Sequence, residues 1–469
     1  MSRQQAGNLP DIFARAVSDL RADPASPIAI ALSGGLDSSV LLHLAHAWAR
    51  EHGVKLFAFH VHHGISPNAD SWRSHCEAEC ASLGVAFDCR SVTLTKTRSG
   101  VEAAARKLRY AALGDMCARH GVHLMLTAHH LDDQAETVLL QLLRGSGMAG
   151  LSGMDVANSA PELLGNARLV MARPLLPVTR QALESYAAEH QLAWVDDESN
   201  LDARYARNAL RLTVMPALGA AFPGFQERFA RSAAHAQSAQ RLLAEMAAQD
   251  VAAVEVEGTI DVAKLRAMSL DRVRNLLRHW FGLKNVRMPS SAWLDEMVTQ
   301  LLEARPGAQM LVTHPDCLIR RHRDRLHIVP KLDDLAGMRD PDDEGVIERH
   351  AQQFRWQGEA AIDFPDYGGT LHFDSADLGL CPDWLRQQAL QIDFRVGGEK
   401  LKLAHNRPTR SLKYHYQAMD VPAWERTRLP VVKAGKALLF AAGIGMDCDQ
   451  LREAAGSIAL RWESTAGAP

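Results

Sequence analysis

The sequence predicts an α/β fold for the N-terminal part of the chain, with a parallel sheet flanked by helices. Short apolar segments alternate there with helical segments, which is the pattern of strands joined by crossover helices. The apolar segments lack regular polar alternation, which is typical of strands that are buried on both faces. A glycine-rich turn links the first of these segments to a helix, which indicates a phosphate-binding loop.

Four apolar segments are the predicted strands of this sheet. They cover residues 27–33, 55–61, 85–92 and 123–129. The stretch "SSVLLHLAHAWAREHG" after the first strand and the stretch "VEAAARKLRYAALGDMCARHG" before the fourth have helical patterns. Each helix is long enough to carry the chain back across the sheet, so neighbouring strands are expected to run parallel.

The chain of 469 residues is too long for one ordinary core, and its pattern changes twice. After residue 225 the pattern is mainly helical, and a β-hairpin is predicted over 310–330. A polar, acidic stretch at 331–350 is the predicted linker, and strand-like pieces follow it. We expect an α/β domain at 1–217, a mainly helical middle domain at 218–335 and a small α+β domain at 350–463.

Composition excludes several classes of protein. An apolar content of 47% and a charged content of 23% fit a globular protein, and no apolar run approaches the length of a membrane span. The N-terminus has no apolar core of signal-peptide type. Seven scattered cysteines suggest reduced thiols, so a cytoplasmic location is expected. Because the net charge is −3, any nucleic-acid site must come from local clusters of basic residues.

The turn after the first strand has the residues that a phosphate site needs. Two adjacent glycines let backbone amides converge on an anion, and three serines add hydroxyl donors. The N-terminus of the next helix points its positive dipole end at the same place. The predicted ATP-binding residues here are Ser33, Gly34, Gly35, Leu36, Asp37, Ser38 and Ser39.

Asp37 distinguishes this turn from a Walker loop, which would carry a lysine. A carboxylate beside phosphates repels them unless a cation lies between, so Asp37 predicts a bound Mg²⁺. A plain strand-to-helix turn with an aspartate cap is the alternative. The Ser-Gly-Gly-x-Asp-Ser pattern resembles the loop of the N-type ATP pyrophosphatases, also called PP-loop enzymes. That resemblance implies that the loop holds the β,γ-phosphates as a leaving pyrophosphate while a substrate oxygen is adenylated.

A second polar motif follows the fourth strand. His129 lies at the carboxyl end of that strand, where open α/β sheets bind ligands. Asp132, Asp133 and Glu136 begin the next helix, and Glu136 shares a helix face with both aspartates. Helix capping by Asp133 is the alternative. Beside the serine–glycine loop, the motif predicts the second half of one site, with His129 as a further ATP ligand.

The second motif, read as H-x-x-D-D-x-x-E-T, is similar to one family in particular, the tRNA(Ile)-lysidine synthetases. The similarity continues through "RPLL" (173–176), "DESNLDARYARNALR" (197–211), "FRVGGEKLKL" (394–403) and "GIGMD" (443–447). One departure is Tyr416-Gln417-Ala418, where we expect Gln-Glu after an aromatic residue. The resemblance implies a Rossmann-like catalytic domain of the adenine nucleotide alpha hydrolase-like type, a tRNA-binding middle domain and the C-terminal domain of this family.

The resemblance also implies a two-step reaction on an isoleucine tRNA with a CAU anticodon. ATP adenylates the C2 oxygen of the wobble cytidine, and the ε-amine of free L-lysine then displaces AMP to give lysidine. Carboxylates suit the binding and deprotonation of lysine, so Asp37, Asp132, Asp133 and Glu136 are the predicted catalytic residues. Which carboxylates bind lysine and which bind Mg²⁺ is left open.

Three clusters of basic residues, in 204–211, 264–288 and 320–325, are candidate tRNA contacts, because lysine and arginine position RNA through its phosphates. Arg106 and Arg109, three apart on one predicted helix, could also meet a phosphate or the tRNA backbone. An exposed basic face without a ligand is the alternative for each cluster. The predicted tRNA-binding residues are Arg106, Arg109, Arg204, Arg207, Arg211, Arg272, Arg274 and Arg278. A homodimer is possible, and no membrane partner is expected.

Other enzymes on the same adenylating domain are the competing interpretation. A tRNA cytidine thiolase is disfavoured, because the sequence has no C-x-x-C pair. An amidotransferase-type ligase is disfavoured, because no N-terminal cysteine nucleophile is evident. An RNA-binding protein with an inactive nucleotide fold is a third alternative, which the two intact motifs oppose.

Overall fold

The computed structural model describes residues 8–21, 23, 25–62, 64, 66–93, 101–198, 204, 206–305, 310–331, 351–426 and 428–464. Most of the predicted linker, and residues 199–203 and 205 of the motif at 197–211, lie outside these ranges. The chain divides into two compact units, residues 1–243 and residues 244–469. Within the described ranges, no helix is both long and apolar enough to cross a lipid bilayer.

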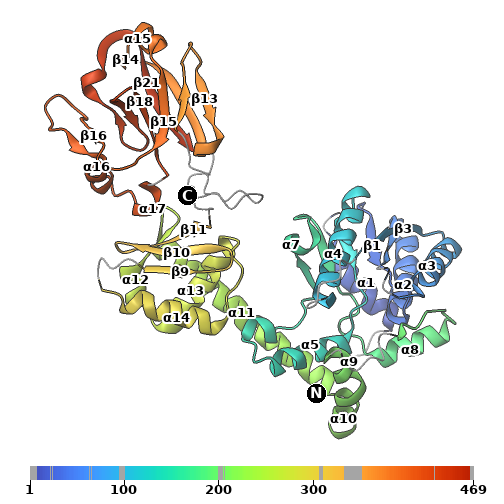
Figure 1. Cartoon of the computed structure of the whole chain (residues 1–469). Coiled ribbons are helices and arrows are strands. Elements are labelled where there is room, and N and C mark those ends of the chain that lie inside the picture. The colour runs from blue at the N-terminus through green and yellow to red at the C-terminus, as the bar shows by residue number, and fades with distance from the viewer. Residues whose placement is uncertain are drawn as a thin grey trace. The chain divides into compact units, whose positions relative to one another are not determined.

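The first unit is built on a six-stranded sheet in the order β3-β2-β1-β4-β6-β5 (Figure 1). The four predicted strands form β1 (Ile28–Ala31), β2 (Leu56–His62), β3 (Ala86–Ser91) and β4 (Leu124–Leu126), all parallel. The sequence did not predict β5 (Ala157–Ser159) or β6 (Val170–Ala172). Strand β6 is parallel to β4 and β5 is antiparallel to β6, so the sheet is mixed but mostly parallel.

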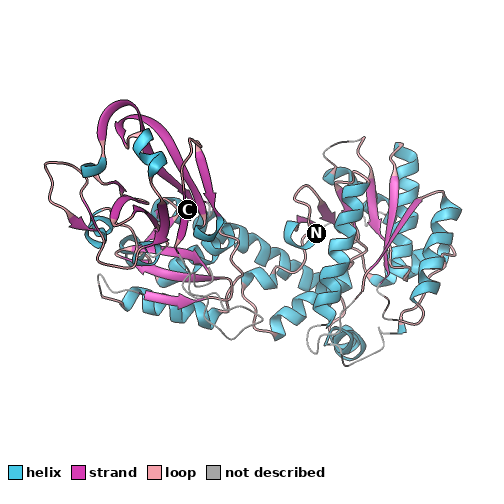
Figure 2. Ribbon diagram, turned by 45° about the horizontal axis from the view of Figure 1, so that its top comes forward, coloured by secondary structure: helices cyan, strands magenta, loops and turns pink. Residues whose placement is uncertain are grey.

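Helices cover both faces of this sheet, as Figure 2 shows. Helices α1 (Leu9–Leu20), α2 (Leu36–His52), α3 (Ala69–Leu83) and α8 (Arg180–Glu189) contribute to the core on one face, and α4 (Val101–Arg119) and α7 (Pro161–Leu164) to the core on the other. In β1, Ile28 and Ile30 belong to the first core and Ala29 to the second, because successive side chains of a strand point to opposite faces. Burial on both faces explains the continuous apolar strands of the sequence.

Further helices complete the first unit beside the carboxyl edge of the sheet. They are α5 (Leu131–Leu143), α6 (Met148–Leu151), α9 (Ala206–Ala209), a π-helical turn (Leu210–Val214), α10 (Met215–Ala221) and the start of α11 (Phe225–Val254). Ala135 of α5 packs in a small core with Met215 and Phe225. This packing brings the arginines before α10 against the acidic start of α5.

The second unit begins with helices packed on a five-stranded sheet. After α12 (Val262–Arg266), α13 (Leu270–Leu283) and α14 (Ser291–Glu303) come β9 (Met310–Thr313), β10 (Cys317–His322) and β11 (Arg325–Pro330). The predicted hairpin region, 310–330, contains three antiparallel strands, β9, β10 and β11, and β8 (Thr259–Asp261) and β7 (Glu255–Val256) extend the sheet. The region is helical, as predicted, but its helices cover a sheet around the buried Trp280 and Phe281.

The last part of the second unit is mainly antiparallel sheet. One sheet has β12 (Gln352–Phe354), β15 (Leu390–Phe394), β18 (Pro430–Ala434), β19 (Ala437–Ala441) and β20 (Gly445–Met446), and another has β13 (Ala361–Phe364), β14 (Gly369–Gly379) and β21 (Arg452–Ser464). Short helices α15 (Pro382–Gln387), α16 (Leu412–Ala418) and α17 (Ala423–Arg426) accompany the sheets. The strand-like pieces of the sequence are thus strands of this region.

Candidate active site

The serine–glycine loop lies between β1 and α2, as predicted. Gly34 has φ +88°, a left-handed conformation that side chains rarely adopt. A Cβ atom at Gly34 would lie 3.0 Å from Cys76 Sγ and 3.1 Å from Val195 Cγ2. Both the backbone angle and the available space therefore require glycine at this position.

The Ser38 hydroxyl organises the loop from inside. It accepts hydrogen bonds from the amides of Ser33, at 3.2 Å, and Gly34, at 3.1 Å, and it donates to the Gly35 carbonyl at 2.9 Å. Gly35 is the N-cap of α2 and has no side chain that could cap the helix. The Ser33 and Gly34 amides thus converge on the Ser38 hydroxyl, and the N-terminus of α2, which has no side-chain cap, favours an anion such as a phosphate.

His130 is the N-cap of α5 and lies among three carboxylates. Its ring nitrogens are 3.7 Å from Asp37 Oδ2, 3.8 Å from Asp132 Oδ2 and 3.4 Å from Asp133 Oδ2, and its side chain is only 1% exposed. Burial disfavours the imidazolium, but the carboxylates of Asp37 and Asp133 outweigh this effect and raise the pKa of His130. His130 therefore joins the loop to the acidic motif electrostatically.

Two buried atoms at this junction lack hydrogen-bond partners among the residues that the structure describes. They are Asp37 Oδ1 and His130 Nε2. A buried polar atom without a partner costs free energy, and such atoms are frequent where a ligand or ion binds. The free Asp37 oxygen, beside a phosphate-type loop, fits the hard oxygen ligand that Mg²⁺ requires.

Asp133 and Glu136 form a salt-bridge network with two arginines from the segment before α10. Arg207 Nε lies 2.8 Å from Glu136 Oε2 and Arg211 Nε lies 2.7 Å from Glu136 Oε1. Both guanidinium groups also donate to Asp133 Oδ1, each at 3.1 Å. Burial raises the pKa of a carboxyl, but His130 and Arg207 outweigh burial and lower the pKa of Asp133. Two of the eight arginines predicted as tRNA ligands thus bind two of the four predicted catalytic acids.

Arg180, at the start of α8, connects the remaining two acids. Its Nη1 donates to Asp37 Oδ2 at 3.0 Å, and its backbone N donates to Asp132 Oδ2 at 2.8 Å. The other Asp132 oxygen accepts from Gln226 Nε2 at 3.0 Å. The structure therefore brings all four predicted catalytic carboxylates into one connected cluster.

His129 points to a different partner from His130 and lines a cavity. Its Nδ1 lies 2.9 Å from Thr127 Oγ1, and burial lowers the pKa of His129 to about 4, so the ring is neutral at pH 7. The cavity has a volume of about 340 Å³ and contains the side chains of Arg106, Arg144 and Arg207 besides His129. Its wall therefore carries three arginines among neutral residues, and one of them, Arg207, belongs to the salt-bridge network.

The other six residues that were predicted to bind tRNA lie in both units of the chain. Arg106 and Arg109 lie 5.0 and 5.4 Å from the centre of the Tyr110 ring, in cation–π contact, and Arg204 is exposed. The remaining three lie on α13 in the second unit, and each has a protein partner. Those pairs are Arg272 with Asp250, Arg274 with Asp295 at 2.7 Å, and Arg278 with Ser291 at 2.9 Å.

Sequence reasoning missed His130, Arg180, Gln226 and Arg144. His130 had a local signal, since it stands at the N-cap position of the predicted helix. Arg180 follows the recognised "RPLL" stretch, but its contact with Asp37 spans 143 positions and has no local pattern. Arg144 lies in the stretch "LLRG" (142–145), which also resembles the family, whereas Gln226 carries no signal of its own in the sequence.

Comparisons with known families identify all three parts of the chain. A PP-loop domain matches residues 9–218, a TilS substrate binding domain matches residues 260–327, and a TilS substrate C-terminal domain matches residues 390–462. The PP-loop match contains both the serine–glycine loop and the α5 acids. It supports the use of ATP by this site.

Relatives match over most of their length. The tRNA(Ile)-lysidine synthase of Ralstonia nicotianae is 43% identical, and the alignment covers 90% of this chain and 89% of the relative. The synthase of Burkholderia pseudomallei is 42% identical with the same coverage, and that of Alkalilimnicola ehrlichii is 38% identical over 93% of each chain. The chain therefore belongs to the tRNA(Ile)-lysidine synthase family and has the activity of these ATP-dependent ligases.

Proposed function

We propose that the chain joins L-lysine to C2 of the wobble cytidine of the isoleucine tRNA with a CAU anticodon. ATP first adenylates the C2 oxygen and releases pyrophosphate, and the lysine ε-amine then displaces AMP. One observation in the structure of this chain supports the proposal. A phosphate-type loop and an acidic helix start meet at Arg180, which hydrogen-bonds to Asp37 and to Asp132.

The loop is suited to bind the β,γ-phosphates of ATP. The amides that now bond to Ser38 can turn to phosphate oxygens, and the Ser33 hydroxyl is 3.0 Å from the Ser38 hydroxyl, so both can contact the same group. Asp37, with its unpartnered oxygen, is the residue that we assign to Mg²⁺. The ion would supply positive charge beside the leaving pyrophosphate.

The salt-bridge network is suited to the charged end of an amino acid. Free lysine presents an α-ammonium and an α-carboxylate, and the network offers carboxylates and guanidinium groups side by side. Asp133 and Arg207 keep exposed surface, at 13% and 32% of their side chains, whereas Glu136 keeps 2%. We assign the α-ammonium to Asp133 and the α-carboxylate to Arg207, and a positioning role to Glu136.

The ε-amine of lysine must lose its proton before it attacks C2. Asp132 is the remaining α5 carboxylate, with 23% of its side chain exposed, and it shares Arg180 with Asp37. We assign the general base to Asp132, because this position borders both the phosphate loop and the acidic network. A carboxylate within hydrogen-bond reach of the amine can accept this proton.

The tRNA is expected to contact the basic residues beside the cavity. Arg106 and Arg144 are exposed and line it, and Arg109 and Arg204 add positive charge in the same unit. We retain Arg272, Arg274 and Arg278 as further phosphate contacts, since half-paired guanidinium groups keep free donors. Such contacts position RNA through its phosphates rather than reading its bases.

The experiment is a ligation assay with ATP, the isoleucine tRNA and labelled lysine. The proposal expects label in the RNA, with AMP and pyrophosphate released in a lysine-dependent reaction. The methionine tRNA, which also has a CAU anticodon, is the matched control and should stay unlabelled. Release of ADP and phosphate, or sulfur-dependent modification of the tRNA, would contradict the proposal.

A further inference from the structure

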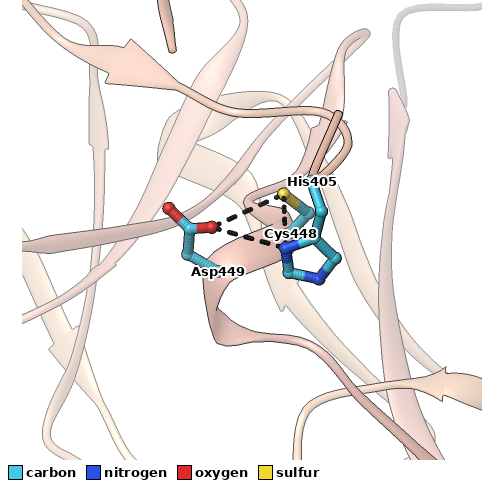
Figure 3. A group of neighbouring side chains, drawn as sticks. All are labelled: His405, Cys448 and Asp449. Carbon is cyan, nitrogen blue, oxygen red and sulfur yellow. Dashed lines mark hydrogen bonds and ion pairs between the residues drawn. The ribbon is translucent and has the colours of Figure 1, made fainter. Parts of the chain in front are cut away.

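A second group of reactive side chains lies in the C-terminal region, apart from the α5 acids and the phosphate loop. Figure 3 shows His405, Cys448 and Asp449 pointing toward one another. His405 comes from the segment between β16 (Lys400–Leu401) and β17 (Arg410–Ser411), whereas Cys448 and Asp449 belong to a 3₁₀ turn, Cys448–Gln450. The group therefore joins two segments that are about forty positions apart in the sequence.

The three ligand atoms form a nearly equilateral triangle. Cys448 Sγ lies 3.9 Å from His405 Nδ1 and 3.8 Å from Asp449 Oδ1, and these last two atoms are 3.7 Å apart. The centre of such a triangle lies at its side divided by √3, about 2.2 Å from each atom. Bonds from zinc to nitrogen, oxygen and sulfur are about 2.0–2.3 Å long, so one ion fits the centre with little movement.

Backbone hydrogen bonds hold both segments in register. The Cys448 amide donates to the Lys402 carbonyl at 2.8 Å, and the Lys402 amide donates to Asp447 Oδ2 at 3.1 Å. Asp447 also caps the 3₁₀ turn by accepting from the Asp449 amide at 3.0 Å. The triangle therefore does not depend on side-chain contacts alone. Cys448 is buried while His405 and Asp449 are exposed, which leaves one side of the triangle open to solvent.

We propose that His405, Cys448 and Asp449 bind one divalent transition-metal ion, of which zinc is the best match. Mg²⁺ and Ca²⁺ prefer oxygen ligands alone, whereas zinc accepts imidazole, thiolate and carboxylate together. Water completes the coordination from the open side. On binding, the Cys448 thiol releases its proton to solvent as the sulfur–metal bond forms. The ion ties the β16–β17 segment to the 3₁₀ turn.

The Lys402 ammonium competes with the metal ion for Asp449. Its Nζ lies 3.0 Å from Asp449 Oδ1, the oxygen that the ion would use. The carboxylate can keep Lys402 on its second oxygen, so the ion pair weakens metal binding without excluding it. Removal of this ammonium by Lys402→Gln should therefore tighten metal binding, whereas an unchanged affinity would mean that Asp449 is no ligand and would overturn the three-ligand site.

The experiment uses the full-length chain after dialysis against a chelator, with excess Mg²⁺ present to occupy sites made of oxygen ligands. Titration with Co²⁺ should give a thiolate-to-cobalt charge-transfer band that saturates at one ion per chain and is abolished by zinc. Cys448→Ser should lose the band. Cys381→Ser, at another free cysteine of the same region, is the matched control and should keep it.

His405→Ala tests the same site at an exposed position, where loss of the fold is not expected. Its cobalt affinity should fall at least about tenfold, because the loss of even an outer-shell partner of a metal ligand typically costs about ten- to hundredfold. Zinc should raise the thermal midpoint of the wild-type chain but not of this variant. A band that persists in Cys448→Ser, an unchanged affinity in His405→Ala, or no saturable cobalt binding in the wild type would each overturn the proposal. None of these readouts depends on ligase activity.

Discussion

Arg180 Nη1 lies 3.0 Å from Asp37 Oδ2, so a side chain at the start of α8 holds the one acidic residue of the phosphate loop. The same residue donates its backbone amide to Asp132. Arg180 thus orients carboxylates from α2 and α5 together. This arrangement pairs the charge of the acid in the proposed phosphate-binding loop.

Substitution of Arg180 should therefore slow adenylation. Because Arg180 is partly exposed, solvent screens its ion pair, and we expect Arg180→Ala to lower the rate of pyrophosphate release by about tenfold. Arg180→Lys should recover only part of this rate, since an ammonium lacks the planar donor geometry. The measurement is the single-turnover rate of adenylation. A wild-type rate in Arg180→Ala would show that Arg180 does not contribute to this step.

Asp37→Ala should abolish adenylation while tRNA still binds. The substitution removes the proposed Mg²⁺ ligand and leaves the arginines beside the cavity intact. Pyrophosphate release and tRNA filter binding measure the two properties separately. Normal turnover in this variant would contradict the proposed role of the loop.

Gly34→Ala and Gly35→Ala form a matched pair. Alanine at Gly34 meets both a left-handed φ and a contact of 3.0 Å, whereas at Gly35 its nearest neighbour is Ser33 Oγ at 3.7 Å. We expect Gly34→Ala to destabilise the loop by about 1–3 kcal/mol and to weaken ATP binding at least tenfold. Gly35→Ala should leave the free energy of unfolding within about 1 kcal/mol of wild type. Equal effects of the two substitutions would contradict this assignment.

Glu136→Gln tests the salt-bridge network. Glu136 is buried, and both of its oxygens bind guanidinium groups. Loss of a buried partner can cost about 3–5 kcal/mol, but the arginines are about one-third exposed, so we expect about 1–3 kcal/mol from urea unfolding. The KM for lysine should rise as well. Asp374→Asn, which breaks an exposed pair with Arg461, is the control and should change stability by less than about 0.5 kcal/mol.

The half-buried His129, whose pKa is lowered, should make the first unit less stable in mild acid. Its pKa of about 4 is below its ordinary value near 6.5, so the unfolded chain binds the proton more readily. The stabilisation is present above pH 6.5 and is lost as the pH falls toward 4. The unfolding free energy of wild type relative to His129→Asn should drop by about 2–3 kcal/mol across this window. A constant difference would contradict a lowered pKa of His129 in the folded chain.

Wild type and His129→Asn must be compared with each other, because protonation of His130 changes the pH dependence of stability in the opposite direction. Its raised pKa means that the folded chain holds this proton more tightly, and that contribution is lost as the pH rises through the folded pKa. His130 is present in both members of the pair. Its contribution therefore cancels to first order.

Local patterns in the sequence were sufficient for the strands β1–β4, the phosphate loop and the acidic helix start. Apolar runs, a Gly-Gly turn and carboxylates at a helix N-terminus each depend on neighbours within a few positions, so the sequence alone determines them. Strands β5 and β6 were not predicted; β5 contains the polar residues Asn158 and Ser159 and so gives no apolar run. The sheet under α13 and α14 was predicted only in the region 310–330, which contains β9, β10 and β11. Strands β7 and β8, of two and three residues, were not predicted.

Tertiary structure alone decided which charges meet. The sequence predicted Arg207 and Arg211 to be RNA contacts, because a charged side chain does not by itself specify its partner. Packing of α5 against α10 and the start of α11 places these arginines on Asp133 and Glu136, more than seventy positions away. Once these groups are partly buried, each charge needs an opposite charge close by, and only the folded chain determines which one is within reach.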